Sequence, residues 1–150
     1  MSETNSETFV NLDNARNEEQ RRVMETIQDN ADCPFCPDHL AKYHKLPILR
    51  TGENWLLTTN QWPYENTVHH FLAIAAYHAE SLSDLQPGAF EELKDHFAWA
   101  EDEFKIASGG IAMRFGDTSN NGATVRHLHA HLIQPKPDLE KSDKVRFKIG

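Results

Sequence analysis

The chain has 150 residues, with 15 Lys and Arg against 23 Asp and Glu, so its formal net charge is -8. This length fits one domain that buries roughly 70% of its unfolded surface, and the acidity argues against a broad face for nucleic acids. It contains no apolar run that could span a membrane, residues 1–30 are too polar for a secretory signal, and two cysteines cannot build a disulfide framework, so we expect a cytoplasmic protein.

Residues 1–32 form a polar extension. Residues 1–11 have almost nothing to bury, which predicts a mobile tail. Residues 13–29 carry a narrow apolar stripe, which predicts a surface helix and leaves open whether a helix forms at all. Two prolines then interrupt residues 33–37, Cys-Pro-Phe-Cys-Pro, and predict a compact knuckle.

The remaining chain alternates strand and helix patterns. Strands are predicted at 47–50, 55–59, 70–76, 111–115 and 125–134, with a polar loop at 117–122. Apolar residues at helical spacing predict one long helix between the third and fourth strands, from about Pro87 to Gly109. This order predicts an α+β fold with a five-stranded antiparallel sheet over 33–137, and a tail, 138–150, that adds an edge strand or crosses to a partner subunit.

Aromatic and histidine side chains outside the last strand have simpler interpretations. The expected core face of the long helix contains Phe90, Phe97 and Phe104. We expect the following histidines on the surface: His44, His69 and His96.

Histidines alternate with apolar residues in the last predicted strand. His127, His129 and His131 would share one face, about 6.6 Å apart, while the residues between them point into the core. Three buried rings would each need a polar partner, so a structural role is less expected than metal binding or phosphate chemistry. The preceding segment, 118–124, offers hydroxyls, amides and a glycine to phosphate oxygens, which favours phosphate chemistry.

Residues 127–133 resemble the signature of the histidine triad family of nucleotide hydrolases and transferases, three histidines alternating with apolar residues and followed by two more apolar residues. The resemblance extends to 70–74, which looks like the family strand with a fourth histidine, to His78, and to 81–85, which looks like the start of the central helix. It covers 33–134 and implies the histidine triad (HIT-like) fold, a homodimer, and chemistry at the α-phosphate of a purine nucleotide.

The resemblance also implies a role for each histidine. His129 would be the nucleophile that becomes nucleotidylated, and His131 would hold the phosphate oxygens and the departing atom. His127 and His70 would orient and polarise the site, and Thr124 would lie near the leaving group. A neutral imidazole can attack phosphorus near pH 7, so no catalytic metal is expected.

Nucleotide contacts are expected from two segments. Asn60 matches the family position that holds the ribose hydroxyls, and Trp62 would line the base pocket or cap the core. Asn121 and Gly122 belong to the segment 118–124, whose amides and glycine are expected to meet the phosphate oxygens. The sequence of residues 60–64, together with that of the triad, resembles members that act on dinucleoside polyphosphates more than members that hydrolyse nucleoside phosphoramidates.

The sequence departs from the family pattern at two loop positions. Ala123 stands where many members have a glutamine that contacts phosphate, and Gly116 where they often have an asparagine. These losses motivate an alternative hypothesis, a nucleotide-binding or sensing protein with a degenerate catalytic pocket. A metal-binding protein that uses the triad itself is a further alternative.

Cys33 and Cys36 have the spacing of two zinc thiolates, which is half a zinc site. Several bacterial members of the family bind structural zinc through such a pair, and the resemblance supplies His78 and His127 as the other ligands. His39 is a rival ligand because it follows the pair closely. A redox role is disfavoured because the pair does not lie in a strand–helix–strand unit.

Overall fold

The computed structural model describes residues 8–150, so the mobile tail expected over 1–11 lies mostly outside the described residues. Where the two overlap, Val10 differs from that expectation: its side chain is buried and its backbone bridges to Val125. Among the described residues, each helix is too short or too polar to cross a membrane.

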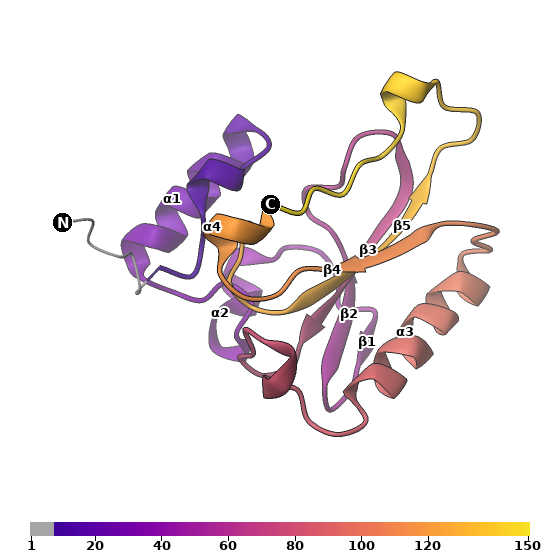
Figure 1. Ribbon diagram of the computed structural model, residues 1–150. Coiled ribbons are helices and arrows are strands. Elements are labelled where there is room, and N and C mark those ends of the chain that lie inside the picture. Colours follow the sequence, from indigo (N-terminus) through magenta and orange to yellow (C-terminus); the bar gives the residue numbers. More distant parts are fainter. Residues whose placement is uncertain (1–7) are drawn as a thin grey trace.

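Helices and strands are interspersed along the chain (Figure 1). The elements are the 3-10 helix η1 (Leu12–Asn14), α1 (Glu18–Asn30), α2 (Pro37–Tyr43), β1 (Arg50–Thr51), β2 (Trp55–Thr59), β3 (Thr67–Ala75), η2 (Leu82–Asp84), α3 (Ala89–Glu103), β4 (Gly110–Met113), α4 (Thr118–Asn121), β5 (His129–Pro135) and η3 (Lys141–Asp143). The strands form one antiparallel sheet in the order β1-β2-β3-β5-β4. The predicted α+β fold with five antiparallel strands and one long helix is confirmed.

The main hydrophobic core lies between α3 and one face of the sheet. Alternate residues of β3, including Phe71 and Ala73, join Ala130 of β5 and Phe97 of α3 in it. The sheet has this core on one face because side chains of a strand alternate between its two faces. The other set of β3 and β5 side chains therefore points away from α3.

Helices α1 and α2 cover the opposite face, so the sheet lies between two layers of helix (Figure 1). Leu40 of α2 packs on Leu72 and Ile74 of β3, and Met24 and Ile27 of α1 pack against Val125. Helix α1 does form, because Asn17 caps it by accepting a hydrogen bond from the Gln20 amide and acidic residues occupy its first turn. It is a structural part of this face.

Several boundaries differ from the sequence expectations. Strand β5 begins at His129 instead of residue 125, α3 ends at Glu103 instead of near Gly109, and the polar loop at 117–122 contains the short helix α4. The tail forms no strand over 145–149 and instead runs back across the sheet toward α4 (Figure 1).

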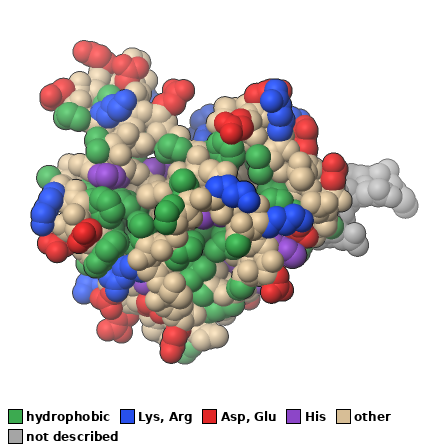
Figure 2. All heavy atoms as spheres, turned by 180° about the vertical axis from the view of Figure 1, so that it is seen from behind, with side chains coloured by type: hydrophobic (Ala, Val, Ile, Leu, Met, Phe, Trp, Pro, Cys, Tyr) green, Lys and Arg blue, Asp and Glu red, His purple; other side chains and the backbone are tan. Residues whose placement is uncertain are grey.

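Three expectations about side-chain burial were wrong. Phe90, in the first turn of α3, is 56% exposed, although Phe97 two turns later on the same side of the helix is buried. His44 is buried and its Nε2 lies 2.7 Å from the Thr58 hydroxyl, and buried His96 lies beside Glu92. His69 is half-buried against aromatic rings. Figure 2 shows the molecule from behind the view of Figure 1. On this face, hydrophobic side chains lie toward the centre and most acidic side chains lie around the margin.

Candidate active site

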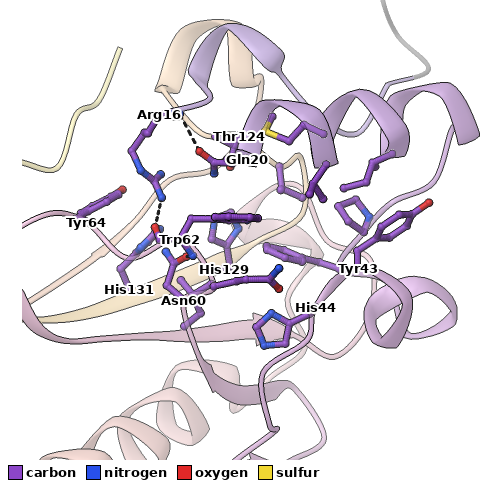
Figure 3. Close-up of a pocket in the computed structure, with 18 of the residues that line it drawn as sticks. Arg16, Gln20, Tyr43, His44, Asn60, Trp62, Tyr64, Thr124, His129 and His131 are labelled. Carbon is purple, nitrogen blue, oxygen red and sulfur yellow. Dashed lines mark hydrogen bonds between the residues drawn. The ribbon is translucent and has the colours of Figure 1, made fainter. Parts of the chain in front are cut away.

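A pocket opens on the sheet face opposite α3, between the sheet and α1 (Figure 3). Residues from the first helix, the segment after β2, the loop before β5 and β5 itself meet there. The lining residues are Arg16, Gln20, Val23, Met24, Ile27, Pro34, Phe35, Tyr43, His44, Asn60, Gln61, Trp62, Tyr64, Leu72, Arg114, Gly122, Thr124, Val125, His129 and His131. The pocket therefore combines an apolar end with two histidines of β5.

His129 has a defined tautomer. Its Nδ1 lies 2.7 Å from the backbone carbonyl of His127, and a carbonyl only accepts hydrogen bonds, so Nδ1 carries the proton. In the neutral ring Nε2 then holds a free lone pair. Nε2 has no hydrogen-bond partner in the described part of the chain, so this nitrogen is available to a ligand in the pocket.

His70 and His131 form a hydrogen-bonded relay. The Tyr64 amide donates to His70 Nδ1 at 3.1 Å, so the proton of neutral His70 lies on Nε2. That Nε2 is 2.7 Å from His131 Nδ1 and donates to it, which leaves the His131 proton on its own Nε2. This buried N–H has no partner in residues 8–150. This N–H is therefore available to donate a hydrogen bond to a ligand in the pocket.

The histidines are neutral near pH 7. Burial lowers the pKa of His129 to about 4, and burial with the nearby charge of Arg16 lowers the pKa of His70 to about 3. Burial also lowers the pKa of His131 well below its usual range. The arrangement thus offers one neutral nucleophilic nitrogen beside one neutral donor.

His127 lies just before β5 and differs from the expectation of three rings on one strand face. Its ring turns to a cluster with Cys33, Cys36 and His78, whose ligand atoms all lie within 4.8 Å of one another. Only His129 and His131 share the strand face toward the pocket. His127 contributes to the pocket through its backbone carbonyl, which fixes the tautomer of His129.

The cluster has the dimensions of a tetrahedral zinc site. His127 Nδ1 lies 3.4 Å from Cys33 Sγ, 3.7 Å from Cys36 Sγ and 3.3 Å from His78 Nδ1. Zinc bonds of about 2.0 Å to nitrogen and about 2.3 Å to sulfur give tetrahedral edges of roughly 3.3 to 3.8 Å. The donor set, two thiols and two imidazoles, therefore fits zinc in kind and in spacing.

The other ring nitrogens in this cluster are also held. His127 Nε2 lies 2.8 Å from the Ala75 carbonyl, and His78 Nε2 lies 2.9 Å from a Glu80 carboxylate oxygen. Such contacts orient metal-binding imidazoles and direct Nδ1 to the ion. His39 lies outside the cluster, with its Nε2 3.7 Å from Asp32.

Solved structures resemble this architecture. A HIT family hydrolase from Clostridium thermocellum aligns over 73% of this chain and 96% of its own, with TM-score 0.55 and 23% identity. A zinc-bound histidine triad family protein from Mycobacterium smegmatis aligns over 79% and 83%, with TM-score 0.53 and 23% identity. A Plasmodium falciparum diadenosine triphosphate hydrolase in complex with cyclomarin A aligns over 61% and 62%, with TM-score 0.51 and 21% identity. This chain has the histidine triad fold. No protein-family model and no curated protein matches it.

Within the histidine triad fold, four of the expected contact residues line the pocket: Asn60, Trp62, Gly122 and Thr124. Asn60 Oδ1 accepts from the Trp62 amide at 2.7 Å, so its side chain also shapes this segment. Asn121 differs, because its amide nitrogen donates to the Phe115 carbonyl and its oxygen accepts from the Ala123 amide. Asn121 positions the loop and does not line the pocket.

Two arginines of the pocket were missed from the sequence. The Arg16 guanidinium lies 4.6 Å from the centre of the Tyr64 ring and donates to the Trp62 carbonyl. The Arg114 guanidinium lies 3.4 Å from the Tyr64 hydroxyl. Arg16 belongs to the polar extension and Arg114 follows an edge strand, so no local pattern indicates that they meet.

The C-terminal tail packs beside this end of the pocket. The Phe147 ring lies 5.0 Å from the His131 ring and 3.7 Å from the Arg114 guanidinium, and the Lys148 carbonyl accepts from Arg114 Nε. The tail passes so close to Gly122, which has φ +80°, that a Cβ there would lie 3.1 Å from the Lys148 oxygen. The tail thus packs on its own chain's pocket.

Proposed function

We propose that this protein is a histidine triad enzyme that transfers or hydrolyses the nucleotidyl group of a purine nucleotide through a covalent intermediate on His129. The observation that carries the proposal is the pairing in one pocket of the His129 Nε2 lone pair with the unpartnered His131 Nε2–H. A nucleophile and a donor are the two groups that displacement at phosphorus requires. The triad motif and the fold support the family assignment.

In the first step the His129 Nε2 lone pair attacks the α-phosphorus. A P–N bond forms while the bond from phosphorus to the leaving group breaks, and the leaving group takes that electron pair; a departing amine also takes one proton from solvent, which the water of the second step returns. The ring becomes an imidazolium, whose Nδ1–H stays bonded to the His127 carbonyl. The His131 N–H donates to a phosphate oxygen or to the departing atom and offsets the developing charge.

In the second step water or another acceptor attacks the nucleotidyl group. A P–O bond forms, the P–N bond breaks, and its electron pair returns to His129 Nε2, which restores the neutral ring. The proton of the attacking water passes to solvent. The pKa of His129, lowered by burial to about 4, keeps the ring neutral for the next cycle. Both steps use groups of the chain, and we propose that no catalytic metal takes part.

The pocket also fits the nucleoside. Its apolar end combines Met24 and Ile27 of α1 with Phe35 and Leu72, which suits the flat, mostly apolar faces of a purine. Asn60 and Trp62 lie beside His129 and His131 (Figure 3), where the ribose next to the reacting phosphate would lie. We propose a dinucleoside polyphosphate or a nucleoside phosphoramidate as the substrate.

We also propose a structural zinc ion held by Cys33, Cys36, His78 and His127. The tetrahedral spacing supports it, and one of the similar structures is of a zinc-bound protein. Zinc would tie together segments that precede α2, follow β3 and precede β5. Both cysteines are free of disulfides, as is usual in a reducing compartment, and we propose a cytoplasmic location.

A homodimer completes the proposal. The outer edge of β4 has no neighbouring strand within the described chain, and Ile111 and Phe115 beside it are 63% and 56% exposed. An apolar free edge favours pairing with a second copy.

Intact-mass measurement tests the covalent step. The parent and His129→Ala are mixed with adenosine phosphoramidate or a diadenosine polyphosphate and quenched without acid, which preserves a P–N bond. We expect an adenylyl adduct on the parent and none on the variant. His39→Ala, which changes a histidine outside the pocket, is the matched control and should form the adduct.

The same experiment distinguishes the alternative of a nucleotide sensor, which is motivated by Ala123 at the position where the resemblance leads us to expect a glutamine that contacts phosphate. Nucleotide binding without adduct or product, in the parent and variant alike, would contradict the enzyme and support the sensor.

A further inference from the structure

Two positive charges reach the pocket, and the described part of the chain gives neither of them a negative partner. Neither Arg16 nor Arg114 forms an ion pair with any carboxylate among residues 8–150, although the chain has a net charge of -8. Among residues 8–150, the lining of the pocket contains no Asp or Glu. In an acidic protein, an acid-free pocket with two arginines is complementary to an anion.

The arginines are held in place. Arg16 lies at the rim, where it stacks on Tyr64 and donates to the Trp62 carbonyl, and Gln20 accepts from its backbone amide at 2.8 Å. Arg114 is fixed by Phe147 and by the Lys148 carbonyl. These contacts already restrict the arginine side chains, so less side-chain conformational entropy is lost when a ligand binds.

Their position identifies which part of a substrate they would meet. Both guanidinia contact Tyr64, and the Tyr64 ring stacks on His131 at 5.8 Å with an angle of 19° between the planes. In Figure 3, Arg16, Tyr64 and His131 gather at one end of the pocket and Tyr43 lies at the other, beyond His129. The charges therefore lie beyond the reacting phosphate, on the side away from the base.

We propose that Arg16 and Arg114 bind the phosphates of the leaving group and make the enzyme selective for nucleoside polyphosphates over substrates with an uncharged leaving group. The inference rests on the proposed function. A polyphosphate leaving group carries several negative charges, whereas the ammonia that leaves a phosphoramidate carries none. Guanidinium groups match phosphate oxygens with paired N–H donors.

Electrostatics at the histidines support the same arrangement. The charges of Arg16 and Arg114 help lower the pKa of His70, after burial, and both also act on His129 and His131. Their field therefore reaches the place where the transferred phosphate would lie.

The test compares two substrates in Arg16→Gln and Arg114→Gln. We expect kcat/KM for diadenosine tetraphosphate to fall about tenfold in each variant, which is the effect of one charge-assisted hydrogen bond discounted for solvent exposure. We expect kcat/KM for adenosine phosphoramidate to change less than about threefold. Arg22→Gln is the control, because Arg22 is an exposed arginine of α1 outside the pocket. Equal losses on both substrates, or no loss on either, would overturn the inference.

A binding measurement separates this inference from the proposed chemistry. In a His129→Ala background, which cannot form the adduct, Arg16→Gln should weaken ATP binding about tenfold and leave AMP binding nearly unchanged, and Arg16→Lys should restore part of the difference. Unchanged ATP-to-AMP selectivity would overturn the role of the arginines. A parent enzyme that binds ATP selectively but turns over neither substrate would instead contradict only the proposed catalysis.

Discussion

Replacement of Cys33 by serine tests the zinc site most directly. Cys33 is 5% exposed and its Sγ lies 3.5 and 3.4 Å from the ligand nitrogens of His78 and His127, so water cannot easily replace it as a ligand. Zinc bound at a thousand times its dissociation constant stabilises the folded state by about 4 kcal/mol. For a chain of this length each kcal/mol shifts the melting temperature by about 2 to 4 °C. We expect Cys33→Ser to lose its zinc and to melt about 8 to 16 °C lower.

The assay measures zinc per chain by elemental analysis and the melting temperature by calorimetry on the same preparation. His39→Asn serves as the control, because His39 follows the cysteine pair in sequence but lies outside the cluster, and it should keep its zinc. Retention of one zinc per chain and of the parent melting temperature by Cys33→Ser would refute the site. Loss of zinc from His129→Ala would instead indicate that the triad binds the metal.

Three further predictions follow from the pocket and the sheet edge. His131→Asn keeps a polar atom near His70 but removes the Nε2–H donor, so kcat should fall about a hundredfold with little change in KM, and an unchanged kcat would contradict the role of that donor. Burial lowers the pKa of His129 to about 4 and of His70 to about 3, so below pH 6.5 the unfolded chain binds more protons than the folded chain does. The free energy of unfolding measured with urea should therefore be highest above pH 6.5 and fall by a few kcal/mol toward pH 4, and a flat profile would show that these rings are charged or exposed in the folded state. Ile111→Asp at the edge of β4 should give a monomer by light scattering, and a persistent dimer would place the interface elsewhere.

The sequence was sufficient for those features that depend on local pattern. Apolar spacing predicted α3, alternation predicted the central strands, and the resemblance placed His129, His131 and His70 on adjacent strands. It also selected four ligands that the fold brings together from three separate segments. These features depend on periodicity and on motif, both of which can be read along the chain.

The rest depends on contacts between distant segments. The stripe of α1 predicted a surface helix, but Met24 and Ile27 line the pocket and pack in one cluster with Val125 and Phe35. Arg16 lies 48 positions before Tyr64 in the numbering of the chain, and no periodicity connects them. Helix and strand propensities and residue spacing do not encode contacts between distant segments. The local sequence therefore does not distinguish an arginine at the pocket from an arginine in solvent.

The position of His127 connects the proposed zinc site with the proposed nucleophile. Alternation along the chain would place its ring beside His129, but the ring turns toward Cys33 and the strand begins two residues later. The same residue directs its carbonyl at His129 Nδ1, 2.7 Å away. A ring fixed by a metal on Nδ1 and by the Ala75 carbonyl on Nε2 leaves its own backbone little freedom, so the acceptor that sets the His129 tautomer is fixed as well. Loss of zinc should therefore lower kcat even where the fold survives, because the nucleophile would lose its fixed tautomer before the pocket loses its shape.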